Sequence, residues 1–589
     1  MVDIKREWEE LVSQAVNLLL REAGSAGDLV VADQVISERP PRSDLGDLAF
    51  PMFPFAKLLR TAPPLVASRI KETLERIGGA NGLPGEVNAA GPYLNVRFSI
   101  AKVAGGVIDE VLRLGDEYGK SRRLAGQHIM VEFSSPNTNK PLHLGHLRND
   151  ILGESVSRVL AACGAEVCKV NLINDRGVHI CKSMLAYKRF GAGQTPEAAG
   201  QKSDHFVGDY YVRFNTWSKE DAEAEEGARE LLRRWEAGDS EVRELWSLMN
   251  RWAIDGITKT YRRTGISFDR VYYESNTYEQ GREEVLKGLQ SGAFYREPDG
   301  SVWVDLTDVG LDKKVLLRKD GTTVYVTQDI GTAIARHRDY PFDRLIYVVA
   351  SEQQYHFKVL FDILKRLGFP WAGNLYHLSY GMVNLPEGKM KSREGTVVDA
   401  DDLFDELSEM AAGEIREKGR AEEVGDVGKT AEAIALGALN YYLLQVSPAK
   451  DMIFDPKESI SFTGNTGPYL QYMGTRISSM LRKFDEFGED FTGRFRPELL
   501  KEGDEWDIVK LLGSYPEVVD RAGAEYNPSM VTAYLYDLSR TFSRYYHDNP
   551  VLYNTDQDLV ATRVRLCRAV EQVLKSAFAL VAIPFLERM

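Results

Sequence analysis

A strand, a helix and a second strand follow one another between residues 128 and 173, and this order constrains the fold more than any other feature of the chain. The first strand is the short apolar run His128–Phe133. The helix carries apolar residues at helical spacing from Leu147 onward, and Gly164 is suited to end it. The second strand is the apolar, β-branched run Val167–Ile173. A unit of this kind predicts a parallel sheet.

The turn between the first strand and the helix holds the sequence His143-Leu144-Gly145-His146. The N-terminus of a helix, at the carboxyl end of a strand, favours phosphate because backbone N–H groups and the helix dipole point at it. The two imidazoles can hydrogen-bond phosphate oxygens, and Gly145 lets a base or ribose approach the backbone. Taken alone, the motif more often marks a helix N-terminus with surface histidines, because chance matches are common.

A second motif lies much farther along the chain. The basic, glycine-flanked loop Lys389-Met-Lys-Ser-Arg-Glu-Gly395 follows another strand-like run, Tyr376–Val383. The two motifs in this order resemble the HIGH and KMSKS signatures of class I aminoacyl-tRNA synthetases. Other segments are similar to the arginyl-tRNA synthetase versions of this family, and the resemblance extends through most of the 589 residues; these segments are Ser134–Asn137, Tyr325–Asp329, Gln353–His356 and Thr466–Tyr472.

The composition is that of an ordinary globular protein, and it sets few limits on function. No run of about 18 apolar residues predicts a transmembrane helix, and the charged N-terminus lacks the apolar core of a secretory signal. The four cysteines form no Cys-x-x-Cys pair, so we expect a cytoplasmic protein without a zinc site or disulfides. A net charge of −14 does not suggest nucleic-acid binding, but phosphate contacts depend on local charge.

The chain is predicted to be an α/β protein of three parts. Residues 1–120 form an N-terminal α/β additional domain, and residues 121–410 form a Rossmann-type, doubly wound parallel-sheet catalytic domain. A charged helical insertion interrupts the catalytic domain at about 195–265, and residues 411–589 form an all-helical bundle. By resemblance, the first part touches the tRNA elbow and the last binds the anticodon; from pattern alone, the first part could be a capping domain without RNA contact.

The resemblance implies that arginine is activated by ATP and then transferred to tRNA(Arg). The ATP site would comprise His143, Gly145, His146, Lys389, Met390 and Ser392, and the catalytic residues would be His143, His146, Lys140, Lys389 and Lys391. Ser392 stands where the family signature has its second lysine. In arginyl-tRNA synthetases that lack this lysine, a lysine just before the HIGH element stands in, and Lys140 occupies that place. Lys140 could otherwise be a surface lysine.

A guanidinium group is best bound by buried carboxylates. By resemblance, Glu274, Tyr325 and Asp329 would bind the guanidinium of arginine, while Asn137 and Gln353 would hold its α-amino and carboxylate end. Asp329 could instead cap the following helix. Gln353 follows the apolar strand Leu345–Ala350, at a carboxyl end where ligands bind in open α/β sheets.

The interpretation of the residues predicted to bind tRNA stays open. By resemblance, Gln471, Tyr472, Arg476, Arg540 and Arg544 would bind tRNA, because aromatic and arginine side chains suit splayed bases. They could equally be core aromatics and solvated arginines.

His179 and His356 fit no zinc spacing, so no metal site is expected and Mg²⁺ would be held by ATP. Arg176 stands where the family element Asn-Asp-x-Gly usually has an aromatic residue, and its role is open.

We therefore predict an arginine–tRNA ligase that acts as a monomer. Two rivals remain at this point. A cysteinyl-type synthetase is disfavoured because that family binds its substrate through zinc. A non-catalytic tRNA-binding paralogue is disfavoured because the two motif histidines and the carboxylates of the arginine pocket are present.

Overall fold

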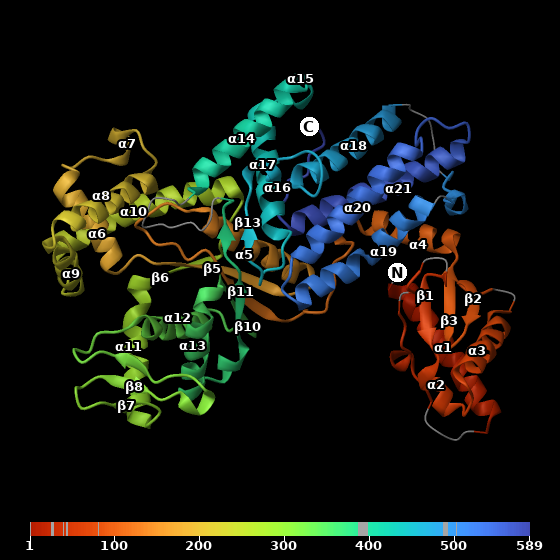
Figure 1. The fold of residues 1–589 in the computed structure, drawn as a ribbon, viewed down its shortest axis with the longest axis horizontal. Coiled ribbons are helices and arrows are strands. Elements are labelled where there is room, and N and C mark those ends of the chain that lie inside the picture. The colour runs from red at the N-terminus through yellow and green to blue at the C-terminus, as the bar shows by residue number, and fades with distance from the viewer. Residues whose placement is uncertain are drawn as a thin grey trace. The chain divides into compact units, whose positions relative to one another are not determined.

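The computed structural model describes residues 2–24, 29–38, 40–42, 45–79, 82–386, 398–486, 493–501 and 503–589. The chain forms two compact units (Figure 1). The larger unit comprises Lys120–Thr475, Val519–Ala533 and Ala577–Met589. The smaller comprises Met1–Gly119, Arg476–Val518 and Tyr534–Ser576. In the described part of the chain, no helix has the length and apolar character needed to cross a membrane.

The larger unit is built on a parallel sheet of five strands. Their order is β11-β10-β4-β5-β6, and the strands are β4 (His128–Glu132), β5 (Glu166–Ile173), β6 (Arg270–Tyr273), β10 (Arg344–Ala350) and β11 (Leu375–Tyr380). Helix α5 (Leu144–Ala162) connects β4 to β5, as the sequence predicted. The chain adds β5 and β6 on one side of β4 and later adds β10 and β11 on the other. This reversal at β4 is where open α/β sheets bind ligands.

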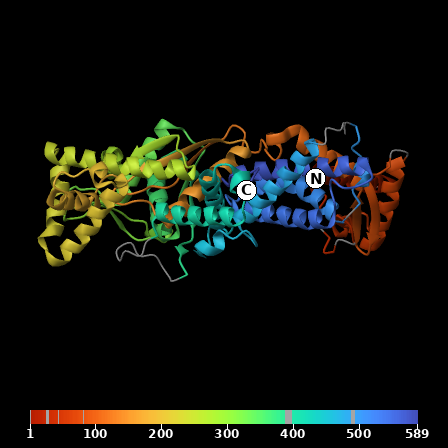
Figure 2. The ribbon, with the colours of Figure 1, turned by 90° about the horizontal axis from the view of Figure 1, so that it is seen from above.

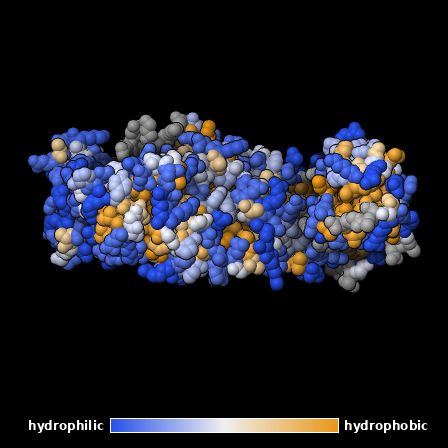
Figure 3. Space-filling view, turned by 90° about the horizontal axis from the view of Figure 1, so that it is seen from below, coloured by the Kyte–Doolittle hydropathy of each residue, from blue (hydrophilic) through white to orange (hydrophobic). Residues whose placement is uncertain are grey.

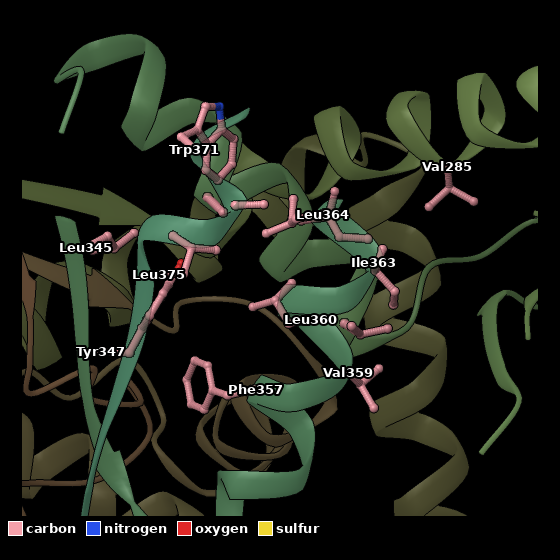
Figure 4. Close-up of a cluster of buried hydrophobic side chains, with 14 of the residues drawn as sticks. Val285, Leu345, Tyr347, Phe357, Val359, Leu360, Ile363, Leu364, Trp371 and Leu375 are labelled. Atoms are coloured by element: carbon pink, nitrogen blue, oxygen red, sulfur yellow. The ribbon is translucent and has the colours of Figure 1, made fainter. Parts of the chain in front are cut away.

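Helix α13 (Gln354–Arg366) packs against β10 and β11 through a buried apolar cluster (Figure 4). Phe357, Leu360 and Leu364 lie at spacings of three and four residues, so they share one face of the helix. They meet Leu345 and Leu375 from the strands. Full burial of each such side chain contributes about 1.5–3 kcal/mol, and the cluster holds α13 against β10 and β11.

The residues predicted to form a helical insertion are helical, and these helices gather into one cluster (yellow in Figures 1 and 2). They have their own core, which includes Phe206, Trp235 and Trp252. The elements are α7 (Pro196–Ala199), α8 (Ser203–Glu220), α9 (Glu223–Glu236) and α10 (Ser240–Thr264), and α6 (Val178–Phe190), which precedes the predicted insertion, packs with them. A further segment, which the sequence analysis did not expect, is a small antiparallel sheet after helix α11 (Glu274–Ser291); its strands are β7 (Tyr295–Arg296), β8 (Val302–Val304) and β9 (Lys314–Leu317).

The C-terminal part of the chain is helical, as predicted. Its longer helices are α14 (Ala400–Glu417), α16 (Val427–Leu444), α18 (Gly467–Glu486), α19 (Gly503–Ala524), α20 (Ser529–Asp548) and α21 (Gln557–Leu580). Two two-residue strands, β12 (Val383–Asn384) and β13 (Met452–Ile453), pair in parallel. The predicted boundary near residue 411 stays a prediction.

The N-terminal residues form an α/β arrangement, as predicted. Strands β1 (Leu48–Pro51), β3 (Tyr93–Phe98) and β2 (Gly85–Ala90) form an antiparallel sheet in that order. Helix α3 (Pro63–Gly78) packs against β2 and β3, α1 (Val2–Glu22) and α2 (Phe53–Leu58) pack against α3, and α4 (Ile100–Leu114) follows β3. Large apolar side chains are exposed here, among them Val31, Phe53 and Leu65. Figure 3 shows hydrophobic residues gathered on one face of this N-terminal part, at the right of the view.

Candidate active site

A cavity of about 700 Å³, here called the main pocket, lies at the carboxyl ends of the central strands. The segment after β4 contributes Asn137, Lys140 and His143, and helix α8 of the insertion contributes His205 and Tyr211. Other lining residues follow β5 or lie on α6, α11 and α12 (Tyr325–Asp339); they include Asn174, His179, Glu274, Tyr325, Gln328 and Asp329. The pocket therefore occupies the crevice that the strand order predicts.

The two motif histidines cap the N-terminus of α5 reciprocally. The backbone N–H of Gly145 donates to His143 Nδ1 at 3.1 Å, and the backbone N–H of His143 donates to His146 Nδ1 at 3.1 Å. Their ring centroids are 3.8 Å apart. Because each Nδ1 accepts a hydrogen bond, the proton of each neutral ring resides on Nε2. Each ring can therefore donate from Nε2 to a phosphate oxygen.

Both histidines are neutral at physiological pH. Burial, assisted by the nearby Lys140 ammonium, lowers the pKa of His143 to about 3. Burial also lowers the pKa of His146 well below its usual value, and His143 and Lys140 add to this effect. Burial lowers the pKa of Lys140 itself. Near these rings, positive charge toward an anionic ligand comes from Lys140 and the N-terminus of α5.

Gly145 is required by the close approach of its neighbour. A Cβ added at Gly145 would lie 3.0 Å from Cε1 of His143. A similar approach brings the insertion to this loop, since a Cβ at Gly208 of α8 would lie 2.9 Å from Cδ of Pro141. A larger residue at Gly145 would crowd the ring of His143, and one at Gly208 would push α8 away from the loop that holds Pro141.

The chain that follows the second motif pairs directly with the first. Leu144 N–H donates to Val398 O at 3.0 Å, and Ala400 N–H donates to Leu142 O at 3.0 Å. His143 and Asp399 form an antiparallel bridge between these bonds. The second motif thus leads straight into the loop that holds the histidines. The predicted residues Lys389, Met390, Lys391 and Ser392 lie outside the described residues.

Two carboxylates, Glu274 and Asp329, line the main pocket together with Tyr325 and Asn137. Glu274 is buried, which raises the pKa of its carboxyl to about 7; Arg176 opposes this shift, and Asp329 and Asp175 add to it. Asp329 accepts a 2.6 Å hydrogen bond from His356 Nε2. Burial lowers the pKa of His356, but its hydrogen bond with Asp329 and the carboxylate charge raise it, and the net shift is upward. A pair of acidic groups in a semi-enclosed cavity suits a cationic ligand.

Several interpretations of single residues need correction. Asp329 does not cap α12, because Val324 is the N-cap and Asp329 lies within the helix. Gln353 does follow β10, but it is exposed and does not line the main pocket.

Asp204, His205 and Asp401 offer ligand atoms close enough to hold a metal ion. The ammonium of Lys202 already lies 2.9 Å from an oxygen of Asp204 and 2.7 Å from one of Asp401. His205 Nε2 is 3.3 Å from the same carboxylate of Asp401. A cation is thus supplied by the protein itself, and the cluster ties the start of α8 to the start of α14.

The predicted tRNA-binding residues divide by burial. Gln471 is fully buried, and its amide donates to the carbonyl oxygens of Ala433 and Pro584 at 3.0 and 2.9 Å. Its side chain is therefore committed to packing in this structure, and its contact with tRNA stays a prediction. Tyr472 lines a separate cavity of about 240 Å³. Its other lining residues include Phe462, Lys418 and Arg420.

The arginines and tyrosines of α18 to α21 also differ in their exposure. Arg540 and Arg544 are more than half exposed, and Arg544 pairs with Asp504. Arg476 lies over the ring of Tyr546 at 4.7 Å. Tyr545 and Arg563 belong to the interior, where Arg563 pairs with the buried Glu505.

The sequence analysis missed several residues that line the main pocket. Gln328 and Thr332 lie one and two helical turns from the start of α12, on the face that carries Asp329. Asp209 and Tyr211 come from the insertion. The spacing of Gln328 and Thr332 around Asp329 is a signal that could have been used; the insertion residues have none, because the packing of α8 is non-local.

Three family models match the chain. One described as "tRNA synthetases class I (R), catalytic domain" matches residues 108–456. One described as "DALR anticodon binding domain" matches residues 470–589, and one described as "Arginyl tRNA synthetase N terminal domain" matches residues 6–98.

Curated relatives are similar over the whole chain. An arginine–tRNA ligase of Treponema denticola is 56% identical over 600 residues, and one of Treponema pallidum is 54% identical over 595 residues; each alignment covers 100% of both chains. The solved structure of Thermus thermophilus arginyl-tRNA synthetase aligns with a TM-score of 0.78 at 26% identity, and it covers 98% of this chain and 99% of its own. The Plasmodium falciparum arginyl-tRNA synthetase, at 18% identity, shares the fold, with a TM-score of 0.72 and coverage of 98% and 99%.

Proposed function

Because this chain belongs to the arginyl-tRNA synthetases, the class I enzymes that join arginine to tRNA at the expense of ATP, we propose that the main pocket binds arginine and ATP side by side. The observation that carries this proposal is that the lining of the pocket combines two kinds of group. Neutral His143 and the ammonium of Lys140 lie beside the N-terminus of α5, while His146 is absent from the lining. The carboxylates of Glu274 and Asp329 come from other elements, α11 and α12, and we take these two groups as the two ends of the site.

At the nucleotide end, His143 and His146 would donate from Nε2 to phosphate oxygens, and Gly145 would let the ribose approach. Lys140 would place its ammonium against the α-phosphate or the leaving pyrophosphate. Lys389, Lys391, Met390 and Ser392 are proposed to complete this end. Mg²⁺ would arrive as the counterion of ATP and remain on its phosphates.

At the arginine end, Glu274 and Asp329 would accept hydrogen bonds from the guanidinium, and Tyr325 would cover it. Asn137 would hold the α-amino or carboxylate group of arginine, and Gln353 is proposed to approach it from the end of β10. Charge-assisted hydrogen bonds are roughly twice as strong as those between neutral groups, so the two carboxylates would decide the choice of amino acid.

The chemistry then needs little beyond positioning and charge. A carboxylate oxygen of arginine attacks the α-phosphorus of ATP, the bond to the β-phosphate breaks, and pyrophosphate leaves. Lys140 and the two imidazoles would stabilise negative charge on the phosphate oxygens during this step. The 2′-hydroxyl of the terminal adenosine of tRNA then attacks the carbonyl carbon of the adenylate, and AMP leaves.

The proposal is tested by exchange of labelled pyrophosphate into ATP, with each of the common amino acids and with or without tRNA(Arg). Exchange that depends on arginine, and on no other amino acid, is the expected result. Glu274→Gln should weaken arginine binding while ATP binding is preserved. Exchange driven equally by lysine or cysteine would contradict the assignment of the pocket.

We further propose that tRNA is held outside the main pocket by several surfaces. The cavity lined by Tyr472, Phe462, Lys418 and Arg420 would take a splayed base, since it combines aromatic rings with cations. Arg476, Arg540 and Arg544 would contact phosphates. The exposed Phe53, which meets Tyr93 edge to face at 6.0 Å, offers the N-terminal domain a similar stacking surface.

Tyr472→Ala should weaken binding of tRNA(Arg) by about 5-fold to about 150-fold, because one stacked base contributes about 1–3 kcal/mol. A titration of tRNA(Arg) followed by fluorescence anisotropy measures this. Arg540→Ala with Arg544→Ala should flatten the dependence of the same affinity on salt. Arg565→Ala, which removes an exposed arginine paired with Asp109, is the matched control. Unchanged affinity in the Tyr472 variant would remove this cavity from the tRNA site.

The chain is also proposed to act as a monomer in the cytoplasm. Light scattering after size exclusion, with and without tRNA, would test this.

A further inference from the structure

Arg176, the residue that departs from the family element Asn-Asp-x-Gly, is buried beside the arginine end of the main pocket. It is 7% exposed. One of its guanidinium nitrogens, Nη2, donates to Glu236 at the end of α9. The guanidinium lies over the rings of Tyr278 at 4.1 Å and Trp235 at 5.7 Å. Its place is therefore fixed from three sides.

The other terminal nitrogen, Nη1, faces Gln328. In the one orientation that satisfies both neighbours, the side-chain oxygen of Gln328 accepts from Arg176 Nη1 at 2.8 Å, and its nitrogen donates to Glu274 Oε1 at 2.6 Å. Turning the amide over would set its oxygen against a carboxylate and its nitrogen against a guanidinium. Arg176 thus determines which way this amide points.

We propose that Arg176 is a positioning residue for the selection of arginine: it fixes the amide of Gln328, which presents the carboxylate of Glu274 to the pocket. The inference rests on the proposed function, in which Glu274 binds the guanidinium of arginine. Gln328 and Glu274 both line the main pocket. Arg176 is absent from that lining and acts through them.

A resident guanidinium near a site for a second guanidinium would repel the substrate if it carried an unbalanced charge. Glu236 neutralises Arg176 on the side away from Gln328. The pair keeps a directed hydrogen-bond donor toward Gln328 while adding no net charge next to the pocket. Lysine at this position would keep the charge, but it lacks the planar guanidinium whose two terminal nitrogens donate to Glu236 and Gln328 in a fixed geometry.

The charge of Arg176 also favours the ionised form of Glu274. Burial raises the pKa of Glu274 to about 7, and Arg176 opposes the rise. The charged groups around Glu274 come from several elements, namely Asp175 and Arg176 after β5, Asp329 on α12 with its partner His356 on α13, and Glu236 on α9. Because the ionised form of Glu274 binds arginine, affinity should fall as pH drops through about 7. Without Arg176 this fall should occur at higher pH.

The test is the dissociation constant for L-arginine, measured by calorimetry on the full chain between pH 6 and pH 9. Arg176→Met should move the midpoint of the pH dependence upward by about one unit, so that arginine binding at pH 6 weakens about ten-fold. The dissociation constant for ATP should stay within about two-fold. Arg176→Lys should keep the midpoint nearer to that of the parent protein.

Gln328→Met should reproduce the loss of arginine affinity, and the double variant with Arg176→Met should lose little more, since the two residues act in one chain of contacts. Arg243→Met is the matched control. Its guanidinium lies over the same Trp235 ring at 5.2 Å and donates to the Trp235 carbonyl oxygen at 3.1 Å. It should leave arginine binding unchanged.

An unshifted pH dependence in Arg176→Met, or an equal loss of ATP and arginine affinity, would overturn this inference. So would fully additive losses in the double variant. The variant Glu274→Gln distinguishes a failure of this inference from a failure of the proposed function. If that variant binds arginine normally, the arginine site itself is misplaced; if it binds arginine weakly while Arg176→Met behaves as the parent does, only the role of Arg176 fails.

Discussion

Asp329→Asn is expected to raise the Michaelis constant for arginine by about 30-fold to about 4,000-fold while that for ATP changes little. Removing one partner of a buried, hydrogen-bonded charge pair costs about 2–5 kcal/mol, because the other charge is left unpaired. Asparagine keeps the size of the side chain and can still accept from His356, which hydrogen-bonds Asp329 at 2.6 Å. The rise in the Michaelis constant for arginine therefore measures the effect of the negative charge of Asp329. Steady-state aminoacylation with arginine and ATP varied separately measures it.

The control for this prediction lies on the same helix. Asp339 ends α12, is 33% exposed as Asp329 is, and does not line the main pocket. Asp339→Asn should leave both Michaelis constants unchanged. If Asp329→Asn affected ATP and arginine alike, Asp329 would belong to the general architecture of the site and would have no part in reading arginine.

Lys140→Met is expected to slow the activation of arginine by about 100-fold to about 1,000-fold, the cost of one preorganised donor to developing charge. The ammonium of Lys140 lines the pocket beside His143, and Lys140 contributes to the lowered pKa of that ring, so it lies where phosphates would be. The physical reason is that Ser392 leaves the second motif one lysine short. Single-turnover formation of arginyl-adenylate, in the presence of tRNA, separates this step from binding.

Lys389→Met should slow activation to a similar extent if the two lysines share the pyrophosphate charge. Lys182→Met is the matched control, because Lys182 is similarly half-buried but pairs with Glu225 outside the pocket. Near-normal activation in Lys140→Met alongside a severe defect in Lys389→Met would show that Lys140 does not compensate for Ser392.

Periodicity predicted most of the elements of this fold, but it could not say which of their faces meet. The apolar spacing of α5 and the β-branched run of β5 are local signals, and both were read correctly. Burial is a property of the tertiary structure. Gln471 and Tyr472 are neighbours on one helix, and only the packing around them assigns one to the interior and the other to a cavity.

Pocket residues that belong to a sequence motif could be predicted, whereas residues that matter through hydrogen bonds to distant parts of the chain could not. His143, Glu274 and Asp329 could be named because residue type and resemblance agreed, and the structure brings them to one pocket. Gln328 could not be named, because its importance comes from Arg176 on one side and Glu274 on the other. Neither contact is local in sequence, and an amide by itself suggests no chemistry.

The backbone bridge between His143 and Asp399 has a consequence for folding during synthesis on the ribosome. Chains leave the ribosome from the N-terminus, and domains fold as they emerge. The loop with the histidines is synthesised long before Val398 and Ala400, whose backbone groups bond Leu144 and Leu142. Closing so long a loop costs entropy and is slow, so the backbone pairing at the start of α5 is completed only when nearly the whole catalytic region has been translated. Incomplete chains would then release no reactive adenylate into the cell.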